Sequence, residues 1–176
     1  MSMLLPKKWG CNKNEGVDNS APPTIKEDPV EVQLSQHFTL DELVATSRTK
    51  YAEQNREYGI KNIMKLKEHA EFLETVRKLL GCSMLITSSV RCPELNTAVG
   101  GVATSQHMKC EASDFIPSNM TVPDAFYKIF QSKLSFDQLI LEEVGGKQWV
   151  HISNVGVLNR REALVYNGKK YVKYTG

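Results

Sequence analysis

The sequence predicts an α+β fold in which helices pack on an antiparallel sheet. In the first part of the chain, apolar residues recur every three or four positions, as they do on the buried face of a helix. From residue 136 onward, short strand-like runs alternate with glycine-containing turns. This order of helices first and strands later is typical of α+β domains. The chain has no internal repeat, and its 176 residues with 41% hydrophobic content suit one domain with a sizeable core.

Residues 1–35 are expected to form a flexible N-terminal arm, and residues 36–176 the folded domain. The arm mixes proline, glycine, asparagine and acidic residues without apolar periodicity. A short helix should begin after Thr39, because Glu42 follows three residues later at the spacing of a capping box. Residues 47–59 are polar and fit either a helix or a loop.

The strongest helical pattern covers residues 62–81 and predicts a core helix that ends at Gly81. His69 on this helix is expected at the boundary of the core and not as a metal ligand, because no acid or histidine at helical spacing completes a site with it. Further helices are expected over residues 92–101 and 121–133. The expected strands are residues 83–91, 111–116, 136–144, 148–154, 163–166 and 171–174.

Charge and hydropathy argue against several classes of function. The net charge is +2 and the lysines and arginines are spread along the chain, so the basic stripe of a nucleic-acid-binding protein is missing. No window approaches the roughly 20 apolar residues of a membrane span, and the N-terminal residues do not resemble a secretory signal. We therefore expect a protein made in the cytoplasm without a signal peptide, with neither nucleic acid nor membrane as partner.

The four cysteines stand at irregular spacings and include no C-x-x-C pair, which argues against a structural zinc site or a redox couple. Reduced thiols are the simplest interpretation for a cytosolic chain. A bridge between Cys82 and Cys92 remains open from the sequence.

The segment TSQHMKCEASDF, residues 104–115, places His107 seven residues before Asp114. On a helix this spacing would separate them by about 10 Å along the axis, too far for two ligands of one zinc ion. A turning segment that leads into a strand would bring them together. The alternative is an ordinary surface loop, and a metal site needs a third ligand.

His151 is the candidate for the third ligand. Alternation along residues 148–154 places it on the strand face opposite Val150 and Ile152. A His-Asp-His set would leave the fourth position of zinc to water, as hydrolytic chemistry requires.

Three segments of the chain have a familiar pattern: TSSVRCPELNTAVGGVATSQHMKCEASDF, followed by FDQLILEEV and QWVHIS. Together they resemble the zinc D-Ala-D-Ala metallopeptidases, especially the phage-type branch of peptidoglycan-cleaving enzymes. The resemblance covers about residues 37–174, and residues 105–114 follow the family's specific pattern S-x-H-x-x-G-x-A-x-D except at the glycine. It implies a zinc fold of the kind shared by hedgehog-like domains and DD-peptidases. It also implies Zn²⁺ on His107, Asp114 and His151, with a peptidoglycan stem peptide as substrate.

The resemblance also assigns roles around the metal. Ser105 would help to hold the substrate, and Arg91 would contact a substrate carbonyl or carboxylate and stabilise charge in the transition state. The alternative for Arg91 is a salt-bridged surface arginine. Cys110 stands where the family pattern has glycine, and Ser113 where alanine is common. If that position needs a positive φ, the cysteine costs about 1 kcal/mol or more; Cys110 could instead approach the metal as a soft ligand.

The general base is not the usual one. The family's glutamate three residues before the second histidine is replaced here by Gln148, which cannot take a proton. Glu142 and Glu143 are the nearby carboxylates. A two-residue turn in the hairpin would put Glu142 on the face of His151, whereas a three-residue loop would put Glu143 there. Two-residue turns are commonest, and a glutamate follows DQLI-x in the phage-type relatives, so Glu142 is the predicted base.

The sequence thus predicts a monomeric zinc peptidase that hydrolyses peptidoglycan stem peptides, as a carboxypeptidase or an endopeptidase. It would act on the cell wall after release from the cytoplasm or as a virion component. A non-catalytic cell-wall-binding or virion protein with the same zinc fold is the alternative, favoured by Gln148 and Cys110. A zinc-stabilised signalling domain of the hedgehog-like kind is a more remote one.

Overall fold

The computed structural model describes residues 31–176, so Cys11 and most of the expected arm lie outside the described residues. Contacts of the domain begin slightly before residue 36. Gln33 forms an isolated β-bridge with Thr39, and Leu34 and Ser35 are buried.

The helices follow from local signals in the sequence. Thr39 Oγ1 accepts a hydrogen bond from the backbone N–H of Glu42 at the first helix, and Thr121 does the same for Asp124 at the last. Gly81, at φ 75°, ends the long core helix in the left-handed conformation. Among residues 31–176 no helix is long and apolar enough to cross a bilayer. The helices are α1 (Leu40–Val44), α2 (Ala52–Lys61), α3 (Ile63–Leu80), α4 (Pro93–Ala98) and α5 (Val122–Gln131), with 3-10 turns η1 (Thr49–Tyr51), η2 (Gln106–Lys109) and η3 (Gly156–Leu158).

Six strands form one sheet in the order β1-β2-β4-β3-β5-β6. All neighbouring pairs are antiparallel except β3 and β5, which run parallel. The chain leaves β4 through η3 and returns on the far side of β3, so β5 takes the direction of β3. The strands are β1 (Met84–Ser88), β2 (Ala112–Pro117), β3 (Gln138–Val144), β4 (Lys147–Ser153), β5 (Glu162–Tyr166) and β6 (Tyr171–Lys173).

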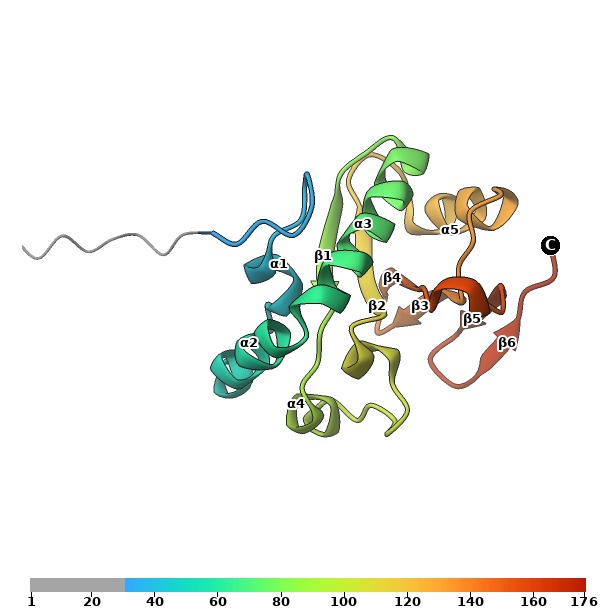
Figure 1. The fold of residues 1–176 in the computed structure, drawn as a ribbon. Helices are drawn as coiled ribbons and strands as arrows, with labels where there is room; N and C mark the ends of the chain where they lie inside the picture. Colours follow the sequence, from blue (N-terminus) through green and yellow to red (C-terminus); the bar gives the residue numbers. More distant parts are fainter. Residues whose placement is uncertain (1–30) are drawn as a thin grey trace, which may run out of the picture. The chain divides into compact units, whose positions relative to one another are not determined.

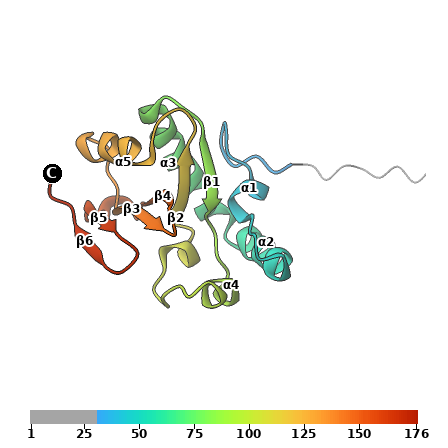
Figure 2. The same ribbon diagram turned by 180° about the vertical axis from the view of Figure 1, so that it is seen from behind.

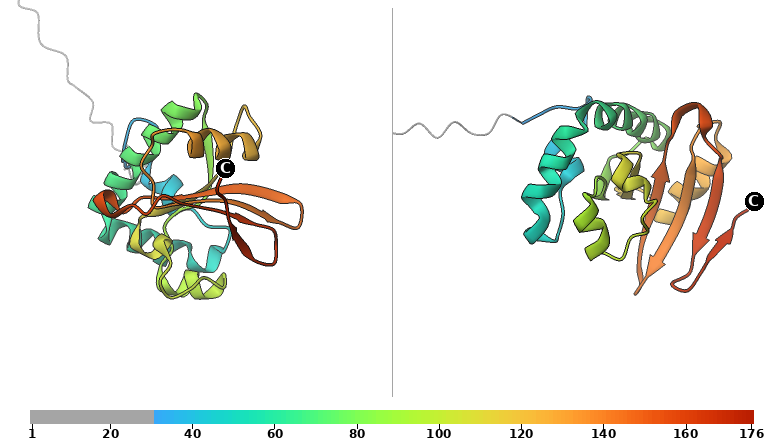
Figure 3. Two further views of the ribbon diagram at one scale, coloured as in Figure 1. Left: turned by 90° about the vertical axis from the view of Figure 1, so that its right-hand side faces the viewer. Right: turned by 60° about the horizontal axis from the view of Figure 1, so that its bottom comes forward.

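The two faces of the sheet have different surroundings. Helices α3 and α5 cover one face, which carries the apolar core, while η2 and α4 lie on the opposite side next to β1 and β2 (Figures 1 and 2). Seen along the sheet, the part formed by β3, β5 and β6 has no described helix on that second side (Figure 3). Side chains alternate between the faces along each strand, so the residues between the core positions point to this open side. The core positions of the sheet include Phe115, Leu139, Leu141, Val150, Ile152 and Ala163.

Candidate metal centre

Three predicted ligands from three different elements meet on the open side of the sheet. His107 lies on η2, Asp114 on β2 and His151 on β4, where Asp114 and His151 are directly paired. One ligand atom from each residue lies within 4.8 Å of the other two, and all three residues are buried. Oδ1 of Asp114 is 3.3 Å from Nε2 of His107 and 2.8 Å from Nδ1 of His151.

These separations suit one zinc ion. Two ligand atoms, each about 2.1 Å from the metal at a tetrahedral angle, lie about 3.4 Å apart. Hydrogen bonds to the other polar atoms of His107 and Asp114 also leave the lone pairs that would face a metal free. Nδ1 of His107 donates to the carbonyl of Ser89 at 2.6 Å, which leaves Nε2 as an acceptor. Nη2 of Arg91 donates to Oδ2 of Asp114 at 2.7 Å, which leaves Oδ1 for a metal.

The protonation states agree with a ligand set. Burial alone would raise the pKa of Asp114, but the adjacent His107 and His151 outweigh it and hold the pKa well below its ordinary value. Burial lowers the pKa of His107, although the neighbouring carboxylate acts in the opposite direction. An ionised aspartate beside a neutral histidine is the state in which both bind a metal.

The 3-10 turn that carries His107 is fixed from two sides. The hydroxyl of Tyr58 on α2 donates to the carbonyl of Met108 at 2.7 Å, and the amide of Gln106 donates to Asp137 at 2.9 Å. Asp137 is itself buried and receives two hydrogen bonds from the guanidinium of Arg160. No motif in the sequence pointed to these supports.

Cys110 ends this turn with φ 59°, so the position does need the left-handed conformation that its glycine counterpart adopts freely. Its thiol is buried, and burial raises its pKa to about 11. Within residues 31–176, Cys110 does not belong to the group of metal-ligating atoms. Cys82, Cys92 and Cys110 are all free thiols, so Cys82 and Cys92 form no bridge.

The hairpin between β3 and β4 determines which of Glu142 and Glu143 lies on the same face of the sheet as His151. Val144 pairs with Lys147, so the loop consists of Gly145 and Gly146, both at positive φ. This two-residue turn pairs Glu142 with Trp149, two residues from His151, and therefore places Glu142 on the open side of the sheet.

Glu143 lies on the other face. It pairs with Gln148, whose amide donates to it at 2.7 Å, and it is exposed. Burial raises the pKa of Glu142, and the nearby Asp114 raises it further. Only Glu142 of the two has the surroundings of an acid–base group.

The centre lies in an open cleft of about 1210 Å³. Besides the three ligands, Arg91, Ser105 and Glu142 line this cleft. The structure thus brings all six residues predicted from the sequence to one cavity.

His69 is buried, so its expected place at the boundary of the core is wrong. It is 3% exposed, and its Nε2 lies 2.8 Å from Oγ of Ser113. The Ser113 hydroxyl donates to Oγ of Ser89 at 2.8 Å, and Ser89 is the residue whose carbonyl orients His107. Because Ser113 uses its proton on Ser89, it accepts from the N–H of His69. Burial keeps the ring of His69 neutral, and within residues 31–176 its buried Nδ1 has no hydrogen-bond partner.

This burial predicts a pH effect on stability. It lowers the pKa of His69 to about 3, whereas an unfolded histidine titrates near 6.5. The unfolded state therefore binds a proton that the folded state does not, and stability falls as the pH drops from about 6.5 towards 3. The slope from this residue is about 1.4 kcal/mol per pH unit. In metal-free protein, His69→Leu should reduce the dependence of the unfolding free energy on pH between 7 and 5, measured with guanidinium; an unchanged slope would contradict the assignment.

An α+β domain with a buried His-Asp-His group and a glutamate in one open cleft has the arrangement of a metal-dependent hydrolytic centre. The sequence model of the family described as Peptidase M15 matches residues 36–153, well over half of the chain, and the chain belongs to that family. A peptide is therefore the class of substrate that the family indicates. A comparison with curated proteins finds no match.

Proposed function

We propose that this chain is a zinc-dependent peptidase that hydrolyses the stem peptide of bacterial peptidoglycan, as a D-Ala-D-Ala carboxypeptidase or an endopeptidase of the endolysin type. The observation that carries the proposal is the position of Glu142, a half-buried carboxylate on the same face and in the same cleft as His107, Asp114 and His151. When bound, zinc supplies Lewis acidity and lowers the pKa of a water molecule.

Glu142 acts as the general base in this proposal. Its carboxylate accepts a proton from the attacking water and returns it to the nitrogen of the leaving amine. The raised pKa of Glu142 favours the first step, because a carboxylate with a higher pKa is a stronger base towards the attacking water. Gln148 has no part in the reaction, since its side chain contacts Glu143 on the far face.

Arg91 orients Asp114 and also offers a hydrogen-bond donor to the substrate. Its Nη2 holds Asp114 and its Nε donates to Oγ of Ser88 at 2.9 Å, so the guanidinium is fixed in the cleft. Nη1 makes no hydrogen bond to residues 31–176 and is free to donate to a substrate oxygen that gains charge. Ser105, at the start of η2 on the cleft wall, offers a hydroxyl to the peptide.

The size of the cleft supports a polymer-linked substrate. Its volume of about 1210 Å³ exceeds the roughly 300–1,000 Å³ of ordinary small-molecule pockets. A stem peptide attached to its glycan is longer than such a ligand. Because the cleft is open, the peptide can bind in it while one of its ends remains attached to the glycan.

Mass spectrometry of purified peptidoglycan tests the proposal. Incubation with the protein should release new peptide fragments, a chelator should stop the release, and added zinc should restore it. The fragment masses distinguish loss of a terminal D-alanine from an internal cut. If a protein shown to hold metal releases nothing, the non-catalytic wall-binding alternative replaces the enzyme.

A further inference from the structure

A row of aromatic side chains crosses the open side of the sheet beside the proposed base. Glu142 pairs with Trp149 of β4 on one side and with Tyr166 of β5 on the other, and Tyr166 pairs with Tyr171 of β6. Directly paired residues point to the same face of a sheet. Trp149, Glu142, Tyr166 and Tyr171 therefore form one line across four strands; we call the three aromatic residues the aromatic row.

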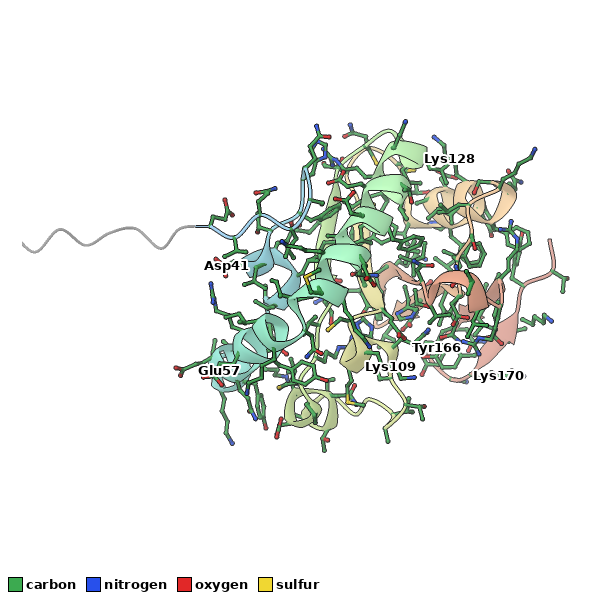
Figure 4. All side chains as sticks on the ribbon, viewed as in Figure 1. Asp41, Glu57, Lys109, Lys128, Tyr166 and Lys170 are labelled. Carbon is green, nitrogen blue, oxygen red and sulfur yellow. The ribbon has the colours of Figure 1, made fainter. Side chains whose placement is uncertain are left out.

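The aromatic row is accessible. Tyr171 is 54% exposed, and Trp149 and Tyr166 are half-buried. The rings of Tyr166 and Tyr171 have centroids 4.5 Å apart and planes inclined by 34°, so they make one continuous surface. Tyr166 points to the side of the sheet away from α5 (Figure 4). Trp149 and Tyr171 both line the cleft that holds the metal-ligand group.

The polar atoms of the row are also free. The hydroxyls of Tyr166 and Tyr171 and the indole N–H of Trp149 make no side-chain hydrogen bond to residues 31–176. Exposed aromatic rings with unused donors at their edges suit a ligand that has an apolar face and a polar rim. A pyranose ring has this shape, with C–H groups on its faces and hydroxyl and acetamido groups around its edge.

Charge separates the two parts of the cleft. Arg48 and Arg91 lie on the side of η1 and α4, where the carboxylates of a stem peptide would be attracted. The aromatic row instead contains the carboxylate of Glu142, and Lys147 lies two residues from Trp149 on the same face of β4, so the two charges beside the row offset each other. A neutral part of the substrate is therefore favoured over the row.

We propose that the aromatic row binds a sugar ring of the peptidoglycan backbone, next to the stem peptide that lies over the metal-ligand group. The inference rests on the proposed function for the identity of the polymer. It makes the enzyme prefer glycan-linked peptides over free ones, with Tyr171 as a specificity-determining residue. Tyr171 lies outside residues 36–153, so this preference is a property that the C-terminal hairpin adds to the family domain.

The test measures binding to metal-free protein by calorimetry, so that no turnover is needed. The ligands are a stem peptide linked to its N-acetylated disaccharide and the same peptide without the sugars. The unmodified protein should bind the linked form about tenfold more tightly, the size expected for one aromatic stacking contact. Tyr171→Ala should abolish this difference, and Tyr171→Phe should keep most of it.

Tyr127→Ala is the matched control, because Tyr127 is a 38% exposed tyrosine on α5 at the other face. It should bind both ligands like the unmodified protein. If Tyr171→Ala weakens the binding of both ligands equally, the aromatic row binds the peptide and not the sugar. If the unmodified protein binds both ligands equally, the aromatic row does not bind the sugar. Either result overturns the proposal. Peptidoglycan cleavage is measured separately, so failure of the aromatic row and failure of the peptidase activity are distinguishable.

Discussion

Asp114→Ala is expected to leave the protein without its metal and without activity. The substitution removes one of three protein ligands and also removes the partner of Arg91, a guanidinium whose side chain is only 18% exposed. A fully buried cation that loses its counter-charge destabilises a fold by about 3–5 kcal/mol, and the largely buried Arg91 should cost part of this. His107→Ala should also lose the metal but should keep the ion pair between Arg91 and Asp114. Elemental analysis of both purified variants measures the metal content.

Asp41→Ala is the matched control for this experiment. Asp41 pairs with Arg56 at 3.0 Å, but both side chains are well exposed. An exposed pair contributes about 0–1 kcal/mol, so this variant should keep its metal, its activity and nearly all of its stability. Full metal occupancy in both Asp114→Ala and His107→Ala would refute the ligand assignment.

Glu142→Gln is expected to keep the metal and to lower the rate of peptide release by about 10²- to 10⁴-fold, the usual effect of removing a general base. The amide retains the shape of the side chain but cannot take a proton. Glu143→Gln should release peptide at the normal rate, because Glu143 is exposed on the opposite face beside Gln148. Release rates from peptidoglycan, with the zinc content of each variant determined, provide the comparison.

The reverse pattern, an inactive Glu143 variant beside an active Glu142 variant, would mean that the proposed base is wrong. Normal rates in both variants would place the base elsewhere in the cleft. A metal-loaded unmodified protein that releases no peptide would point to the non-catalytic alternative and not to either glutamate.

Local signals made most of the fold predictable from the sequence. Thr39, Thr121 and Gly81 act within a few residues of the helix ends that they set. The spacing of residues 62–81 likewise fixes the buried face of α3 through helical periodicity alone. The parallel pairing of β3 and β5 was not predictable in this way, because it depends on the path of the chain after β4 and not on the pattern of either strand.

The candidate site was predictable where only a few residue types can perform the required chemistry. Donor atoms, alternation and the length of a glycine turn pointed to the candidate ligands and to Glu142, and the family resemblance completed their assignment. The contact of Arg91 with Asp114 and the hydrogen bond from His107 to Ser89 were missed, because they join segments that only the fold brings together. His69 was missed for the same reason: helical spacing does not show that Ser113 lies opposite it.

The central place of β4 in the sheet has a consequence for biosynthesis. His151 reaches Asp114 only when β4 inserts between β2 and β3, two strands that leave the ribosome earlier. A nascent chain that has exposed His107 and Asp114 still has an incomplete site until residue 151 has emerged and its long-range pairings have formed. Metal binding should therefore occur late, after the sheet is complete. Truncated translation products should bind no metal at this site and should have no peptidase activity.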